Sequence, residues 1–83
     1  MTTAKKSELK RPLNRMPAWI RQAIVDARLM EQYRSRPPYQ RNDYLGWIIA
    51  PKLESTRVRH LEQMLSELQS GDCYMNMPWG RED

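Results

Sequence analysis

At 83 residues the chain can form one domain with one core, and its 14 Lys and Arg outnumber its 10 Asp and Glu, giving a net charge of +4. Three glycines without phosphate-loop spacing argue against the common nucleotide-binding motifs, and one cysteine with one histidine cannot complete a four-ligand zinc site. The longest uninterrupted apolar run extends only from Trp47 to Ala50, whereas a membrane-spanning helix needs roughly 20 residues. We therefore expect a small basic protein with no cofactor, no metal and no membrane insertion.

The basic charge is concentrated in the first half of the chain. Residues 1–42 hold ten Lys and Arg against three acids, whereas residues 43–83 hold four against seven. We predict a basic disordered arm over residues 1–15, a single helical domain over residues 16–79 and a disordered C-terminus over residues 80–83. The unpaired Cys73 favours a reducing, cytoplasmic location over a secreted one.

A first helical segment is expected to begin at Pro17, because proline lacks the N–H that would be unpaired at the first helical position. It must end before Pro37 and Pro38, since each proline disfavours helical geometry in the preceding residue. A break near residues 26–28 would give two short helices, and both interpretations stay open. The apolar stripe of this segment consists of Trp19, Ile20, Ala23, Ile24, Ala27, Met30 and Tyr33.

A second helix is expected between the proline pair and Pro51. Asn42 could cap its start, although the helix could already begin at residues 39–40. Pro51 should stop it at residue 50, because proline removes a backbone donor. The apolar face of this helix consists of Tyr44, Trp47 and Ile48.

The last helix has the clearest pattern, with apolar residues at spacings of three and four and Gly71 in the usual left-handed position at its end. The segment after Gly71 has no helical or strand period, yet it is too apolar to stay in water, so we expect it to fold back over the helices. The expected fold class is all-α, a small bundle of three, or four, short helices with this irregular apolar C-terminal tail packed on it. The expected structural core is Trp19, Ile20, Ile24, Tyr44, Trp47, Ile48, Val58, Leu61, Leu65 and Leu68.

No group of residues in the sequence fits a catalytic site. His60 flanks the apolar stripe of the last helix, and Cys73 follows Asp72 with no basic neighbour that would favour a thiolate. The acids are scattered, and Glu67 is expected opposite the apolar stripe. We expect no enzyme activity and assign no catalytic, cofactor-binding or metal-binding residue.

Arginine and tyrosine, which are frequent in the energetic centres of protein interfaces, gather around the proline pair and at the start of the last helix. We predict that these residues form a surface for an acidic protein partner. In the competing interpretation, the prolines set a corner between helices and the arginines are merely solvated. The predicted surface consists of Arg34, Arg36, Tyr39, Arg41, Arg57 and Arg59.

Nonspecific nucleic-acid binding is the alternative function, because the basic arm and the same arginines could contact phosphates. The turn around residues 51–54 also resembles that of a helix-turn-helix. Acids along the last helix would repel phosphates and count against this alternative. The residues that would face base edges are Thr56, Arg57, Arg59, His60 and Gln63.

The stretch RPPYQRNDYLGWI, residues 36–48, belongs to a wider resemblance that also includes Thr56-Arg57-x-Arg59 and the closing residues 74–79. These features resemble the YdeI/OmpD-associated family, whose bacterial members are often labelled bacteriocin-protection proteins. The resemblance covers residues 16–79 and departs from the family pattern at Pro51 and His60. It implies a cytoplasmic, noncatalytic helical module tied to envelope stress or antimicrobial-peptide tolerance, and it supplies no catalytic residues.

Overall fold

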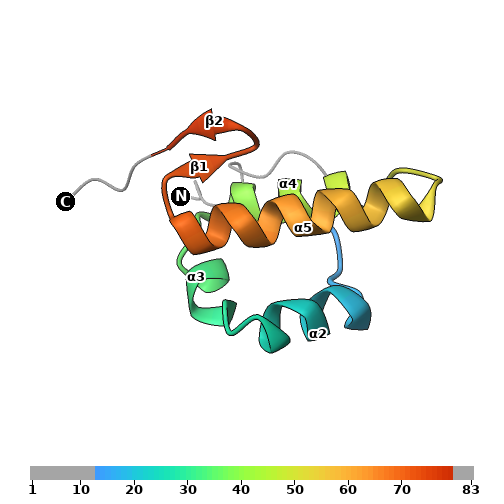
Figure 1. Ribbon diagram of the computed structural model, residues 1–83, viewed down its shortest axis with the longest axis horizontal. Helices are drawn as coiled ribbons and strands as arrows, with labels where there is room; N and C mark the ends of the chain where they lie inside the picture. The colour runs from blue at the N-terminus through green and yellow to red at the C-terminus, as the bar shows by residue number, and fades with distance from the viewer. Residues whose placement is uncertain (1–12, 80–83) are drawn as a thin grey trace, which may run out of the picture.

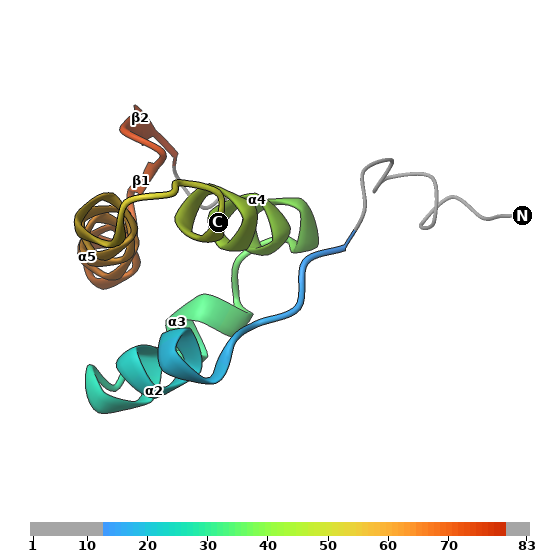
Figure 2. The same cartoon turned by 90° about the vertical axis from the view of Figure 1, so that its right-hand side faces the viewer.

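The computed structural model describes residues 13–79, so most of the expected arm and residues 80–83 lie outside the described residues. Two helices, α4 and α5, pack side by side; α2 and α3 cover one side of this pair, and a hairpin lies on the other side (Figures 1 and 2). The predominantly helical fold confirms the all-α prediction. The elements are α2 (Ala18–Asp26), α3 (Met30–Arg34), α4 (Pro38–Ile49), α5 (Glu54–Ser70), β1 (Cys73–Tyr74) and β2 (Met77–Pro78).

Within residues 13–79, none of the helices is both long and apolar enough to cross a membrane.

The first helical segment is broken into α2 and α3, which settles the choice between one helix and two. Arg28 adopts a left-handed φ of 62°, and two backbone hydrogen bonds close the turn around it. The Arg28 amide donates to the Val25 carbonyl at 2.9 Å, and the Leu29 amide donates to the Ile24 carbonyl at 3.0 Å. This is the Schellman arrangement, in which the residue after the left-handed position packs against the last helical turn. Leu29 and Ile24 are accordingly both buried.

The helix α4 begins at Pro38, earlier than a cap at Asn42 would allow. Proline fits the first turn of a helix, and the extended Pro37 precedes it without a side-chain cap. The Asn42 side chain instead accepts a hydrogen bond from the Asn14 amide at 2.7 Å, and the Asn14 side chain donates to the Asn42 carbonyl at 3.0 Å. The packed part of the chain therefore includes Asn14, which falls within the predicted arm.

The C-terminal tail is a short hairpin, which corrects the expectation of an irregular segment. Tyr74 pairs with Met77 across the two antiparallel strands, and Met75 and Asn76 form the turn with φ values of 53° and 67°. Two successive left-handed residues are typical of the tight turn that matches strand twist. The preceding helix α5 ends at Gly71, whose φ of 80° confirms the predicted left-handed cap. Tyr74 and Met75 pack against the core, as expected for a tail that folds back.

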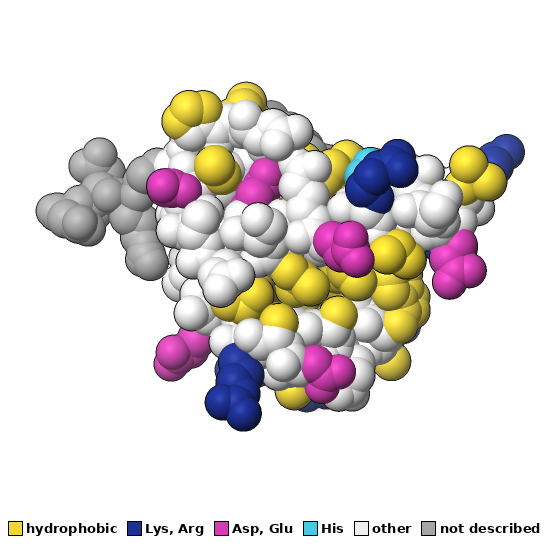
Figure 3. Space-filling view, viewed as in Figure 1, with side chains coloured by type: hydrophobic (Ala, Val, Ile, Leu, Met, Phe, Trp, Pro, Cys, Tyr) yellow, Lys and Arg dark blue, Asp and Glu magenta, His cyan; other side chains and the backbone are white. Residues whose placement is uncertain are grey.

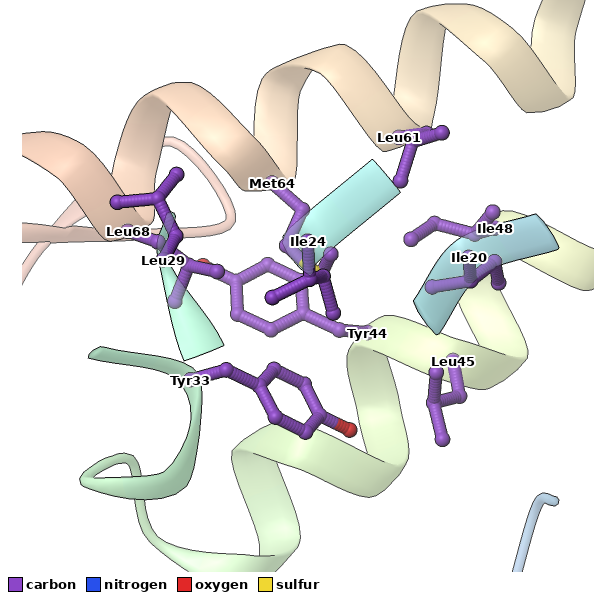
Figure 4. Packing of buried hydrophobic residues seen from close by; sticks show 10 residues of the cluster. All are labelled: Ile20, Ile24, Leu29, Tyr33, Tyr44, Leu45, Ile48, Leu61, Met64 and Leu68. Atoms are coloured by element: carbon purple, nitrogen blue, oxygen red, sulfur yellow. The ribbon is translucent and has the colours of Figure 1, made fainter. Parts of the chain in front are cut away.

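The core lies between the α4–α5 pair and the α2–α3 segment (Figure 4). Of the residues expected there, Trp47 and Leu65 are only partly buried but pack against the core. Leu29, Tyr33, Leu45 and Met64 are buried in addition to the expected set. The expected residues that are buried are Ile20, Ile24, Tyr44, Ile48, Leu61 and Leu68.

Trp19 and Val58 are not core residues, contrary to expectation, because 44% and 40% of their surfaces are exposed. Both lie near the beginnings of their helices, α2 and α5. Figure 3 shows hydrophobic side chains along the seam between these two helices, open to solvent on this face. Helical spacing placed both residues correctly on an apolar stripe, but the stripe extends beyond the part that the other described elements cover.

We expect Arg28→Gly to stabilise the protein by roughly 0.5–1 kcal/mol, because glycine adopts the left-handed conformation without steric cost. The matched control is Arg21→Gly, an exposed position within α2, where glycine should cost about 1 kcal/mol. Urea denaturation of both variants would measure these changes. A loss of stability in Arg28→Gly equal to that in Arg21→Gly would contradict the assigned turn.

Candidate functional site

Arg36 is buried, with 3% of its surface exposed, so its assignment to an interaction surface is corrected. Its guanidinium donates to the Gln40 side-chain oxygen at 3.1 Å and to the Glu67 backbone carbonyl at 2.9 Å. The guanidinium carbon also lies 4.5 Å from the centre of the Trp79 ring. The hydrogen bonds and the aromatic contact offset the cost of removing the charge from water. Arg36 therefore connects the segment before α4 to the end of α5, through the Glu67 carbonyl, and to the C-terminal tail, through the Trp79 ring.

Glu67 is also buried, which corrects its expected place opposite the apolar stripe. Its carboxylate accepts four hydrogen bonds, from the Tyr44 hydroxyl at 2.6 Å, the Gln63 amide group at 3.0 Å and the backbone amides of Met75 and Asn76 at 2.8 Å each. Two successive left-handed residues direct these backbone amides toward one anion. The carboxylate thus joins α4, α5 and the hairpin at one point.

The protonation of this cluster follows from its surroundings. Burial alone would raise the pKa of Glu67, but the bonds from Tyr44, Asn76, Gln63 and Met75 together hold that pKa below its ordinary value. Burial, and then the hydrogen bond to Glu67, raises the pKa of Tyr44 far above its ordinary value. Glu67 is therefore charged and Tyr44 neutral near pH 7. Because the Tyr44 hydroxyl, the Gln63 side chain and the hairpin amides all donate to the Glu67 carboxylate, this group of residues has a structural role. We call it the Glu67 anchor.

Arg34, Tyr39 and Arg41 meet at the corner between α3 and α4. Arg41 donates to the backbone carbonyl of Arg34 at 3.1 Å, which satisfies a carbonyl at the end of α3. Tyr39 is partly exposed, and its ring packs edge-on against Tyr74 at 6.0 Å between ring centres. All three side chains remain accessible at least in part. The side chains of Tyr39 and Arg41 also hold the corner, whereas Arg34 contributes only its backbone carbonyl.

Arg57 and Arg59 lie at the opposite end of the α4–α5 pair. Arg57 donates to the carbonyls of Pro51 at 2.8 Å and Lys52 at 3.0 Å, and so fixes the turn before α5. A helix of the length of α4 spans about 18 Å, which separates this end from the corner near Arg41. The predicted surface is therefore divided into two regions.

Two residues of the proposed recognition helix are engaged in the fold. The His60 ring stacks on Trp47 at 4.0 Å between ring centres, and its Nδ1 lies 3.0 Å from the Trp47 carbonyl oxygen. Gln63 donates to the Glu67 carboxylate. Neither side chain is available to read base edges as a helix-turn-helix would require.

A surface hollow of about 330 Å³ lies where α2 and α5 begin. Trp19, Glu54 and Arg57 line it. Of these residues, only Arg57 belongs to the predicted interaction surface, and Trp19 belongs to the predicted core. The sequence did contain one indication that Trp19 is exposed. It is a large apolar residue near the start of a helix, and the ends of short helices are the parts least covered by neighbouring elements.

Cys73 shows no sign of a reactive thiolate. Burial, with the nearby charges of Asp72 and Glu67, raises the pKa of its thiol, so the protonated form dominates at neutral pH.

The family model described as bacteriocin-protection, YdeI or OmpD-associated matches residues 15–71 of this chain. The match includes all four described helices and ends before the hairpin. No curated protein and no solved structure gives a significant match.

Glu67→Gln should lower the free energy of unfolding by about 1–3 kcal/mol at pH 7, because an amide group cannot accept all the bonds that the carboxylate accepts. The depressed pKa means that the stabilisation by Glu67 is complete above the unfolded-state pKa of about 4.3 and is lost as pH falls through the lower folded-state value. The stability difference between wild type and variant should therefore shrink in acid.

Urea denaturation at pH 7 and at successively lower pH would measure this difference. The matched control is Glu62→Gln, an exposed position on the same helix, which should change stability by less than about 0.5 kcal/mol. A Glu67→Gln variant as stable as wild type at pH 7 would show that the carboxylate does not anchor the hairpin.

Proposed function

This chain belongs to the bacteriocin-protection, YdeI or OmpD-associated family, and we propose that it is a small noncatalytic module that acts by binding another protein. The observation that carries the proposal is the exposed Trp19 beside Arg57 in the hollow between α2 and α5. Tryptophan and arginine are the residue types most enriched in the energetic centres of protein interfaces.

The apolar character of the seam supports a protein partner. Trp19 and Val58 are both partly exposed, and hydrophobic side chains lie on the surface between α2 and α5 (Figure 3). A domain of 83 residues has few large apolar side chains to use for stability, so an outward-facing tryptophan suggests a role in binding. A partner that covered Trp19 would add apolar burial at the centre of a contact.

The charges around the hollow favour a particular kind of partner. Arg57 is held in place by the Pro51 and Lys52 carbonyls, so less side-chain freedom is lost when a partner binds it. Glu54 lines the same hollow and would repel a segment that is acidic throughout. The fitting partner is an amphipathic segment with an apolar side chain for Trp19 and one acidic group placed to meet Arg57.

A noncatalytic role agrees with the state of the reactive groups. The buried Glu67 and Tyr44 are hydrogen-bonded to each other, and the raised pKa keeps Cys73 a thiol. The family description supports a role in protection against bacteriocins, which we extend to the envelope stress that such peptides cause. A cytoplasmic location is part of the proposal and rests on the unpaired Cys73.

The direct test compares bacteria that lack or express the protein when they are exposed to a bacteriocin. Expression of wild type should raise survival, and Trp19→Ala should remove most of that gain, because loss of a central interface tryptophan weakens binding by about tenfold or more. The matched control is Val25→Ala, a partly exposed apolar residue on another face of α2, which should protect as wild type does.

A photo-crosslinking residue at position 18, next to Trp19, should capture a protein partner in the same cells, and Trp19→Ala should abolish the crosslink. Full protection by Trp19→Ala would contradict the proposed surface. Binding of short DNA and RNA that falls steeply with salt and is unaffected by Trp19→Ala would instead favour the nucleic-acid alternative.

A further inference from the structure

A second hollow, of about 190 Å³, lies where the chain before α2 crosses the beginning of α4. It shares no lining residue with the hollow at Trp19. One wall is apolar and consists of Leu13, Pro38 and Leu45, and the polar residues around it are Asn14, Tyr33, Arg41 and Asn42.

The Tyr33 hydroxyl is the unusual group in this hollow. Tyr33 is 7% exposed, and within residues 13–79 its hydroxyl forms no hydrogen bond. Figure 4 shows the Tyr33 ring below Tyr44, with its hydroxyl on the side of the cluster where Leu45 lies. Removing a hydroxyl from water without a partner is costly, and most buried polar groups in proteins are paired. A hydroxyl placed in this way is suited to donate to a ligand.

Arg41 supplies a second donor on the same hollow. One terminal nitrogen donates to the Arg34 carbonyl at 3.1 Å, which holds the guanidinium plane and leaves its other N–H groups for a ligand. None of the described residues that line the hollow is acidic, so the positive charge of Arg41 is not opposed there. Burial raises the pKa of Tyr33 while the charge of Arg41 opposes that rise, so the hydroxyl keeps its proton at neutral pH.

Asn14 and Asn42 form the rest of the polar wall. The Asn14 amide and side chain donate to Asn42 at 2.7–3.1 Å, so these groups hold the wall together. The donors directed at a ligand are then one hydroxyl and one guanidinium. This pair matches the two oxygens of a carboxylate, whereas a phosphate dianion is usually bound by more positive charge or by several backbone amides.

We infer that this hollow binds a carboxylate attached to a short apolar chain. The Tyr33 hydroxyl and the Arg41 guanidinium donate to the carboxylate oxygens, and the apolar part lies against Leu13, Pro38 and Leu45. The volume suits a group the size of one amino-acid side chain. A free short-chain acid and the C-terminal carboxylate of a peptide share this chemistry.

The test is a titration of the full chain, observed through backbone amide chemical shifts, with two matched probe pairs. The pairs are 4-methylpentanoate with 4-methylpentanamide, and N-acetyl-alanyl-leucine with its C-terminal amide. The acids should shift the amides of Tyr33, Arg41 and Leu45, and the neutral amides should not. Binding of both acids would identify a small-acid site, and binding of the peptide acid alone would identify a site for a protein C-terminus.

Two variants test the assigned donors. Tyr33→Phe and Arg41→Gln should each weaken binding of the acids by about tenfold or more, because each removes a hydrogen bond to a charged group. Arg34→Gln is the matched control, since Arg34 contributes only its backbone carbonyl, and it should bind as wild type does. Tyr33→Phe should melt no lower than wild type, because the lost hydroxyl has no partner within the described fold.

Three results would overturn the inference. The first is equal binding of the acids and their amides, and the second is comparable binding of inorganic phosphate at the same residues. The third is unchanged affinity in Tyr33→Phe. None of them bears on Trp19, so the proposed protein-binding role would stand or fall separately.

Discussion

The carboxylate of Glu67 is the interaction on which the arrangement of this small protein depends. It accepts hydrogen bonds from Tyr44 on α4, from Gln63 on its own helix and from two successive amides of the hairpin turn. A buried charge is tolerated only when its hydrogen-bonding capacity is used, and here four donors surround it. The same residue also offers its backbone carbonyl to Arg36, so both buried charges meet at the end of α5.

The hydrogen bonds to Glu67 explain how such a short C-terminal hairpin can be stable in this fold. Two paired strands of two residues each are not stable alone. Met75 also adopts a left-handed conformation, which costs a residue with a side chain about 1–2 kcal/mol. The bonds to Glu67 and the packing of Tyr74 against Tyr44, at 5.4 Å between ring centres, offset these costs. With Trp79 over Arg36, the tail closes the side of the α4–α5 pair that α2 and α3 leave open.

The two candidate binding sites lie in other parts of the molecule. Trp19 and Arg57 face solvent at the beginnings of α2 and α5, and Tyr33 and Arg41 face the hollow near Asn14. Neither site includes Glu67 or a residue that donates a hydrogen bond to its carboxylate. Variants at these two sites should therefore leave the hydrogen bonds to the Glu67 carboxylate in place.

Much of the fold followed from local rules in the sequence. Proline and glycine positions predicted the ends of α4 and α5, and helical spacing predicted the buried Ile24, Ile48 and Leu68. These predictions succeeded because they depend on neighbouring residues within one helix.

The errors concern contacts between distant segments. Arg36 looked like a surface residue because the partners that bury it, Glu67 and Trp79, are far along the chain. The charge of Glu67 predicts an exposed position, although Glu67 lies three residues after the buried Met64 and so on the same helical face. The apolar character of Trp19 predicts burial, although only the neighbouring elements decide how much of a helix's apolar stripe is covered. Spacing predicts Tyr33 on the apolar stripe, but it cannot show that the Tyr33 hydroxyl has no hydrogen-bond partner within residues 13–79.

Amide hydrogen exchange of Met75 and Asn76 in the native protein tests the role of Glu67 most directly. If the carboxylate holds the turn, these two amides should exchange nearly as slowly as the buried amides of α5, although they belong to a two-residue turn near the end of the chain. Exchange at the rate of an unstructured peptide, while α5 remains protected, would show that the hairpin is not anchored and that Glu67 does not organise the fold.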